Sequence, residues 1–183
     1  FPYTTLFRSE KEGARVVAEA LGDHARDVET EEFDIDGWWR GSSAVAVDDP
    51  NGRTFDRDHE VIALPGTAAG EVEGDLVDVG YGIPEEIGAE VEGAVVLARA
   101  AVPDGHDRWA HRLEKYAAAV REGAVGFLFR NHVPGGLPAT GEIGWGRRPS
   151  PIPAAGVSAE VGGRLARDAA DGDPTVRLSV DCR

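Results

Sequence analysis

The stretch that decides the fold is VEGAVVLARAAVPDGHDRWAHRLEKYAAAVREGAVGFLFRNH, residues 91–132. It contains two short apolar runs, Val95–Ala98 and Val125–Phe129, which are typical of strands buried on both faces. Between them, Asp107–Glu122 has the period of an amphipathic helix, and Gly123 follows where a left-handed cap would end it. The apolar stripe of this helix consists of Trp109, Leu113, Tyr116, Ala117 and Val120. The stretch therefore predicts a βαβ unit with parallel strands and a right-handed crossover.

Shorter signals continue on both sides of this unit. On the N-terminal side, Glu60–Leu64 and Asp75–Val79 predict strands, and a glycine turn is expected between them at Gly70–Gly74. On the C-terminal side, Ile152–Val157 leads to Ser158, a suitable N-cap for a helix over Ala159–Asp168. The alternating stretch Thr175–Val180 predicts a last strand.

A short leading piece precedes this main domain. Glu10–Leu21 predicts a helix that ends at Gly22, and both Val28–Ile35 and Ser42–Val47 predict strands. The polar segment Arg53–Asp58 marks the expected boundary. We therefore divide the chain into residues 1–9, residues 10–52 as the leading piece and residues 53–183 as the main domain.

The first nine residues, FPYTTLFRS, carry no starting methionine, no signal-peptide pattern and no periodicity that continues into the helix expected from Glu10. They match the translation of a common sequencing-adapter oligonucleotide. We therefore interpret residues 1–9 as adapter-derived and assign no element of the fold to them. The gene upstream would then be missing, so that a cytoplasmic and a secreted location both stay open.

The composition excludes several classes of function. The chain has 33 acidic and 19 basic residues and a net charge of −14, which disfavours a nucleic-acid-binding surface. No apolar run is long enough for a membrane span, and the single Cys182 cannot form an intrachain disulfide. Of the basic residues 17 are arginine, because Lys11 and Lys115 are the only lysines. Such an acidic, arginine-biased composition resembles haloarchaeal proteins, although an ordinary acidic domain is the alternative.

The sequence offers no established catalytic or metal-binding motif. The five histidines are scattered, no nucleophile elbow occurs, and the glycine clusters fit neither a P-loop nor a dinucleotide fingerprint. Asp107, His111 and Glu114 would share one helix face, but such a charged face is more often solvated than metal-bound. We assign no catalytic residue and no metal ligand.

Two places are candidates for contact with a ligand or a neighbouring domain. Arg130, Asn131 and His132 follow a buried strand, at the edge where α/β sheets present their loops. Trp145 lies with two arginines in the long glycine- and proline-rich loop 133–153, a combination that suits an anionic peptide terminus or a partner interface. Plain loop and core anchoring is the alternative for both places, and Trp38-Trp39-Arg40 fits core or interdomain packing.

Four segments together resemble the protease-associated (PA) domain, a small β-rich domain inserted in several peptidase families. They are GEVEGDLVDVGYGIPEE (70–86), VEGAVVLAR (91–99), KYAAAVREGAVGFLFRNH (115–132) and IPAAGVSAEVGGRL (152–165). The preceding EKEGARVVAEALGDHARDVETEEFDI (10–35) is similar to the opening helix and strand of zinc aminopeptidases, the family of aminopeptidase Y, bacterial leucyl aminopeptidases and glutamate carboxypeptidase.

The resemblance implies an α/β (α+β) fold: a β-rich PA domain with flanking helices, preceded by a helix-strand piece of an incomplete metallopeptidase domain. It implies a fragment of a zinc-dependent aminopeptidase whose PA domain covers the active site and helps bind or orient the peptide. The two zinc ions and the catalytic residues would belong to a catalytic domain downstream, so this chain alone would hold no cofactor and be inactive. The implied partners are the peptide and that catalytic domain.

Three other interpretations stay open. The first is a non-catalytic interaction module such as the same domain in a sorting receptor, and the second is an insert in a subtilisin-like protease. The leading helix and strand argue against both, because neither host needs such a preface. The third is a free-standing domain for a small ligand, which requires the chain to be a whole gene.

Overall fold

A computed structural model describes residues 3–33, 37–48, 52–144, 150–172 and 174–183. The chain forms two compact units, Phe1–Asp36 and Gly37–Arg183. Every strand of the described residues belongs to the second unit.

The first unit consists of helix α1, Tyr3–Gly22, and an irregular segment after it. The helix ends at Gly22 as predicted, but it begins at Tyr3 rather than Glu10, so residues 3–9 belong to it. The strand expected at Val28–Ile35 is wrong for residues 28–33, which have no regular structure, and Ile35 lies outside the described residues. A strand needs a neighbour to bond its N–H and C=O groups, and no described strand pairs with this segment.

The second unit is built on an eight-stranded mixed sheet with the order β2-β1-β8-β4-β5-β6-β7-β3. The pairs β4–β5, β5–β6 and β6–β7 are parallel, and the other neighbours are antiparallel. This mixed α/β architecture confirms the expected fold class. The strands are β1 Arg40–Asp48, β2 Arg53–Phe55, β3 Val61–Ala63, β4 Gly70–Asp78, β5 Val95–Arg99, β6 Gly126–Arg130, β7 Ala154–Val157 and β8 Thr175–Cys182.

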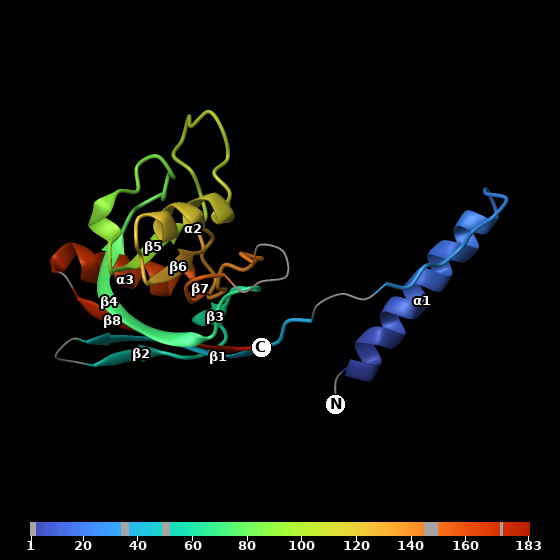
Figure 1. Ribbon diagram of the computed structural model, residues 1–183, viewed down its shortest axis with the longest axis horizontal. Helices are drawn as coiled ribbons and strands as arrows, with labels where there is room; N and C mark the ends of the chain where they lie inside the picture. The colour runs from blue at the N-terminus through green and yellow to red at the C-terminus, as the bar shows by residue number, and fades with distance from the viewer. Residues whose placement is uncertain (1–2, 34–36, 49–51, 145–149, 173) are drawn as a thin grey trace. The chain divides into compact units, whose positions relative to one another are not determined.

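Strand β4 joins the two halves of this sheet. Its first part, Gly70–Asp75, pairs with β8, and its last part, Leu76–Asp78, pairs with β5. Figure 1 shows it as a long, strongly curved ribbon. The turn predicted at Gly70–Gly74 is therefore wrong, because these residues are strand. Gly74 lies there for another reason, since a Cβ at this position would overlap the carbonyl oxygen of Gly93.

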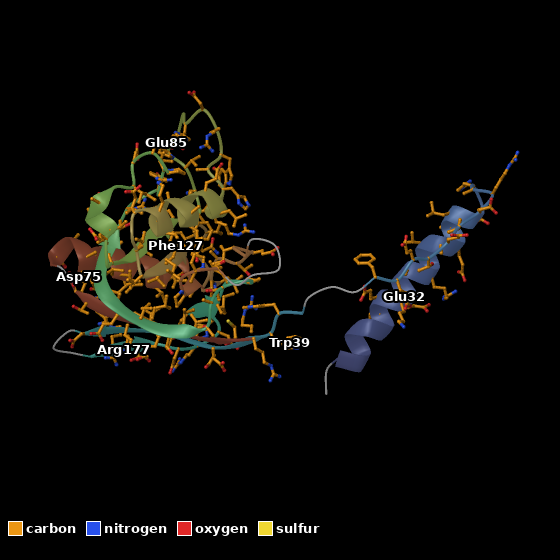
Figure 2. All side chains as sticks on the ribbon, in the orientation of Figure 1. Glu32, Trp39, Asp75, Glu85, Phe127 and Arg177 are labelled. Atoms are coloured by element: carbon orange, nitrogen blue, oxygen red, sulfur yellow. The ribbon has the colours of Figure 1, made fainter. Side chains whose placement is uncertain are left out.

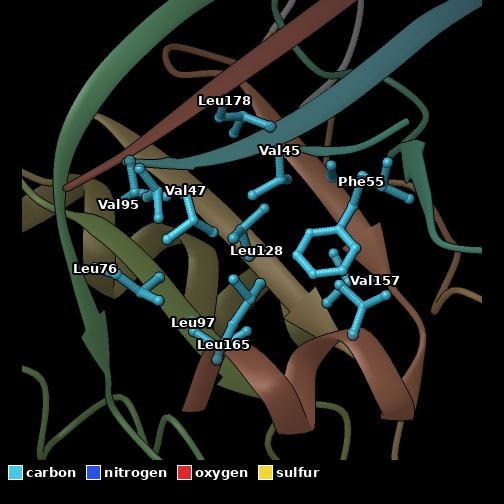
Figure 3. Close-up of a cluster of buried hydrophobic side chains, with 14 of the residues drawn as sticks. Val45, Val47, Phe55, Leu76, Val95, Leu97, Leu128, Val157, Leu165 and Leu178 are labelled. Carbon is cyan, nitrogen blue, oxygen red and sulfur yellow. The ribbon is translucent and has the colours of Figure 1, made fainter. Parts of the chain in front are cut away.

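The main core lies between the antiparallel half of the sheet, the parallel strands and helix α3. It combines Val45 of β1, Leu178 of β8, Leu97 of β5 and Leu165 of α3, all of them fully buried. Figure 3 shows these side chains converging from the strands above onto the helix below. A second cluster on the opposite face of the parallel strands packs Phe127 of β6 against Tyr116 of α2, with ring centroids 5.6 Å apart.

The two helices lie at the predicted positions, but α2 begins later than predicted and α3 ends at Asp171 rather than Asp168. Helix α3, Ala159–Asp171, is capped by Ser158, whose side chain accepts a hydrogen bond from the Val161 N–H. Helix α2, Arg112–Arg121, begins five residues later than expected. His111 caps it, and Glu114 bonds back to the His111 N–H. Trp109 therefore precedes the helix and is exposed, so its predicted place on the apolar stripe is wrong.

The βαβ prediction is confirmed, because β5 and β6 are parallel neighbours and α2 connects them. The compact unit begins at Gly37 rather than at residue 53, because β1 forms a long antiparallel ladder with β8. Trp38 packs against the main core, and its ring lies under the Arg40 guanidinium at 5.5 Å. Trp39 is exposed.

Candidate functional site

The parallel strands β4, β5, β6 and β7 end at one edge of the sheet, where their loops collect. We call this the carboxyl edge and define it by residues 78–88, 99–111 and 130–144. Ligands of α/β sheets usually bind at such an edge, because helix N-termini and mobile loops meet there. In Figure 2 Glu85 marks one of these loops, and Phe127 lies within the protein below it.

Arg99 and Arg130 end two neighbouring strands and lie directly opposite each other in the ladder. Side chains alternate between the faces of a strand, and Leu97 and Leu128 pack in the main core with α3. Both arginines therefore lie on the α3 face of the sheet. Asp78 ends β4 on the same face, two residues after the buried Leu76.

Helix α3 packs directly on the Arg130 side chain. A Cβ at Gly162 would overlap the aliphatic part of Arg130, so glycine is needed for this approach. A Cβ at Gly163 would lie 3.1 Å from an Nη atom of Arg130 and 3.7 Å from an Nη atom of Arg167. The two guanidinium groups are therefore near neighbours. We call Arg99, Arg130 and Arg167 the arginine cluster.

The electrostatics of the cluster are repulsive. Burial lowers the pKa of the Arg130 guanidinium, and the positive charges of Arg99 and Arg167 lower it further, while Asp78 acts in the opposite direction. The Arg99 side chain lies over the Tyr81 ring at 5.3 Å, and its Nε is buried without a hydrogen-bond acceptor in the described structure.

Lys115 of α2 holds the loops of this edge together. Its side chain is fully buried, and its Nζ donates to the carbonyl oxygens of Tyr81, Arg99 and Ala101 at 2.6, 2.8 and 2.6 Å. Burial lowers the pKa of this ammonium to about 8. A single side chain thus fixes the residues that follow both β4 and β5.

The other two residues of the predicted Arg130–His132 site differ in role. Asn131 is turned into its own loop: its Nδ2 donates to the Leu137 carbonyl at 2.9 Å, and its Oδ1 accepts from the Val133 N–H at 3.1 Å. Its side chain shapes the loop. His132 is exposed. The structure therefore brings Arg130 into a cluster with other arginines, leaves His132 at the surface and places Asn131 in a supporting position.

Trp145 and its neighbours Arg147 and Arg148 lie outside the described residues. The Asp107–His111–Glu114 face gains no metal site, because His111 and Glu114 form the helix cap and Glu114 also pairs with Arg108 at 2.7 Å. No group of three or more potential metal ligands occurs in the described part of the chain. None of the helices described is long and apolar enough to cross a membrane.

A comparison with protein families matches residues 72–165, just over half of the chain, to the PA domain. This chain belongs to the PA domain family. The matched segment runs from β4 to α3 and contains Arg99, Arg130 and Lys115. Among curated protein sequences, none matches the chain.

Solved structures share the fold of this PA domain. The aminopeptidase from Aneurinibacillus sp. strain AM-1 is 20% identical with a TM-score of 0.63, over 80% of this chain and 32% of that one. BSAP, a zinc aminopeptidase from Bacillus subtilis, is 19% identical with a TM-score of 0.56, over 79% and 32%. The psychrophilic subtilisin-like protease Apa1 from Pseudoalteromonas sp. AS-11 is 14% identical with a TM-score of 0.55, over 78% and 33%. The matched region is about a third of each of these proteins.

Sequence reasoning missed Arg99, Arg167 and Lys115 in this PA domain. A signal for Arg99 was present, because VVLAR and GFLFR both place an arginine directly after a buried apolar run. Two parallel strands with the same ending bring both arginines to one edge. Arg167 and Lys115 carry no such signal, because charged helix residues are usually solvent-exposed.

Proposed function

We propose that this chain is part of a zinc-dependent aminopeptidase, in which the PA domain covers the active site and helps bind and orient the peptide. The two zinc ions and the catalytic residues would belong to a further domain of the same protein. The described residues contain no group of three or more potential metal ligands, and the contribution that we propose for this chain is to hold the substrate.

One observation carries the choice of an aminopeptidase: the segment before the PA domain is a helix with an apolar face that needs a partner. In the first unit Val16, Val17, Leu21 and Phe33 are between 51% and 81% exposed. Apolar side chains gathered in this way are typical of an element that packs against further structure. A peptidase domain whose opening helix this is would bury them.

The carboxyl edge is the part of the PA domain that we assign to the peptide. Arg130 supplies charge there, His132 supplies an exposed imidazole, and Trp145 belongs to the adjoining long loop. Asn131 acts indirectly, since its two hydrogen bonds hold the loop that carries His132. These residues would position a substrate rather than take part in bond cleavage.

The first test is to sequence the source DNA beyond the Arg183 codon and to express the longer product. We expect a domain with histidine and acidic zinc ligands, and hydrolysis of an aminoacyl p-nitroanilide that a chelator abolishes and added zinc restores. A stop codon, or a domain without such ligands, would overturn the aminopeptidase proposal.

The shared fold with a subtilisin-like protease defines the second candidate, a PA domain inserted in a serine peptidase. The same experiment separates the two hosts. A downstream domain with a serine nucleophile, inhibited by a serine-directed reagent and indifferent to chelators, would favour this alternative.

A further inference from the structure

Several arginines of this protein form ion pairs with a carboxylate. Arg177 pairs with Glu73 at 2.7 Å, and Arg164 pairs with Asp168 at 2.8 Å. Arg15, Arg53, Arg108 and Arg121 are paired in the same way. In a chain with 33 acidic residues such pairs form readily. Arg99, Arg130 and Arg167 form no ion pair within the described residues, although they lie together.

The cluster brings three positive charges together. Arg99 and Arg130 are opposite residues of adjacent strands, and Arg130 and Arg167 both approach Gly163. Asp78 is the one carboxylate whose charge acts on Arg130, and its Oδ1 accepts the Gly80 N–H at 2.9 Å. Like charges held at such spacing destabilise the free protein. Helix α3 also begins at this edge, and its N-terminus adds partial positive charge.

One member of the cluster also has a donor without an acceptor. The Arg99 Nε is buried and has no acceptor in the described structure. A buried donor without a partner is unfavourable, so the free energy of the protein falls if an acceptor oxygen reaches it. The Arg99 side chain is held in place, because its guanidinium lies over the Tyr81 ring and the Arg99 carbonyl oxygen accepts a hydrogen bond from Lys115.

We propose that the arginine cluster is a binding site for a carboxylate group, and that the carboxylate is the C-terminal one of a short peptide. Guanidinium groups bind carboxylates through two parallel hydrogen bonds, which gives orientation as well as attraction. With Asp78 beside it the cluster keeps an excess of two positive charges, so charge alone suits a carboxylate and a phosphate alike, and phosphate is therefore one of the probes. The affinity for an anion rests on the cluster, whereas the choice of a peptide carboxylate rests on the proposed function.

The test measures binding to the 183-residue chain by isothermal titration at low ionic strength. The probes are N-acetyl-trialanine with a free C-terminal carboxylate, the same peptide as its amide, and inorganic phosphate. We expect the carboxylate peptide to bind saturably, at least tenfold more tightly than either other probe. Equal affinity for the carboxylate and the amide, tighter binding of phosphate, or no binding at all would overturn the proposal.

Variants locate the binding. Arg130→Gln and Arg167→Gln should each weaken binding of the carboxylate peptide at least tenfold. The matched control is Arg57→Gln, which removes one positive charge from an exposed position of the same unit and should leave the affinity unchanged. Arg167 is exposed on α3, so its variant keeps the fold even if Arg130→Gln does not. An equal loss of affinity in Arg57→Gln would show that the effect comes from the net charge of the protein, and it would overturn the site.

A stability measurement distinguishes a binding site from a structural cluster. Because the three charges repel, Arg167→Gln should raise the Tm of the free chain while it weakens peptide binding. A structural role predicts a lower Tm instead. The two proposals can fail separately. If Arg167→Gln abolishes peptide binding by this chain but leaves the KM of the longer enzyme normal, the peptide-orienting function is refuted and the carboxylate site stands. If this chain binds no peptide although the longer enzyme is an active aminopeptidase, only the site is refuted.

Discussion

Lys115 is the residue whose environment departs most from expectation. It is one of two lysines in the chain and is fully buried, whereas lysine is almost always exposed unless it is paired. Its ammonium is bonded to carbonyl oxygens alone, each from a residue at the end of a strand or just after it. The residue thus links helix α2 to the loops of the carboxyl edge, and its removal should loosen all of them together.

Lys115→Met should lower the free energy of unfolding by about 3 kcal/mol at pH 7, because buried carbonyl oxygens lose their donor. The pH dependence has a defined sign. The pKa of Lys115 is lowered from 10.5 to about 8, so between these values the unfolded chain holds the proton and the native one does not. Stability from this group is therefore gained as the pH rises from about 8 to 10.5. Urea titrations across this range should show the gap between wild type and variant widening.

Tyr116 also titrates in the upper part of this pH range, and its contribution must be separated from that of Lys115. Burial raises the pKa of its phenol, so stability from Tyr116 is lost as the pH rises above 10 in both proteins. The difference between wild type and Lys115→Met removes this contribution. A gap that stays constant from pH 7 to 10.5 would show that Lys115 keeps its ordinary pKa in the native state.

Among the elements, β7 shows how tightly a loop covers the sheet. A Cβ at Gly156 would overlap the carbonyl oxygen of Ala139, and the Ala139 N–H donates to the Val157 carbonyl at 3.3 Å. Backbone contacts of this kind cannot yield as a flexible side chain does. Gly156→Ala should therefore destabilise the protein by about 3 kcal/mol, the upper part of the range for overpacking.

Gly172→Ala is the matched control, because its φ of 175° is extended and a Cβ there meets no atom within 4 Å. Its effect on stability should stay within about 0.5 kcal/mol. Urea unfolding followed by circular dichroism measures both variants. Equal free energies of unfolding for Gly156→Ala and Gly172→Ala would mean that the backbone at Ala139 moves away from β7 without loss of stability.

The elements that sequence analysis predicted well are those with strong local signals. The apolar runs of β5 and β6 and the Ser158 cap of α3 all lie where the patterns placed them. The first half of β4 was missed because its two glycines indicate a turn, whereas Gly70 has a φ of 151° within the strand and Gly74 allows the close approach of Gly93. The start of α2 was missed because histidine is an uncommon cap.

The arginine cluster could be predicted only in part. The place of Arg130 could be predicted because this residue follows a buried strand, and Arg99 has the same pattern. Arg167 is near them only because α3 packs across the strands through Gly162. That approach depends on tertiary packing, which local patterns do not contain. Trp145 remains a prediction from composition alone.

At the scale of the whole molecule, charge sets the conditions for stability. The formal net charge is −14, and the described ion pairs such as Arg177–Glu71 and Arg108–Glu85 lie at the surface, where each contributes little. Uncompensated carboxylates repel one another over roughly 10 Å at 0.1 M salt, but only over about 3 Å at 1 M. Screening of this repulsion is the mechanism by which an acidic surface of this kind would adapt a protein to high salt.

We therefore expect KCl to stabilise the chain, with a Tm at 2 M at least about 5 °C above that at 0.05 M, since each kcal/mol of relieved repulsion raises Tm by about 2–4 °C at this size. A variant with Asp58→Asn, Glu86→Gln, Asp104→Asn and Asp107→Asn separates screening from a general salt effect. These side chains are exposed and form no ion pair in the described structure. The variant should have a higher Tm than wild type at 0.05 M and a smaller rise with KCl. Identical rises in both proteins, measured by calorimetry, would show that salt acts through apolar burial and that the acidic surface is not an adaptation to it.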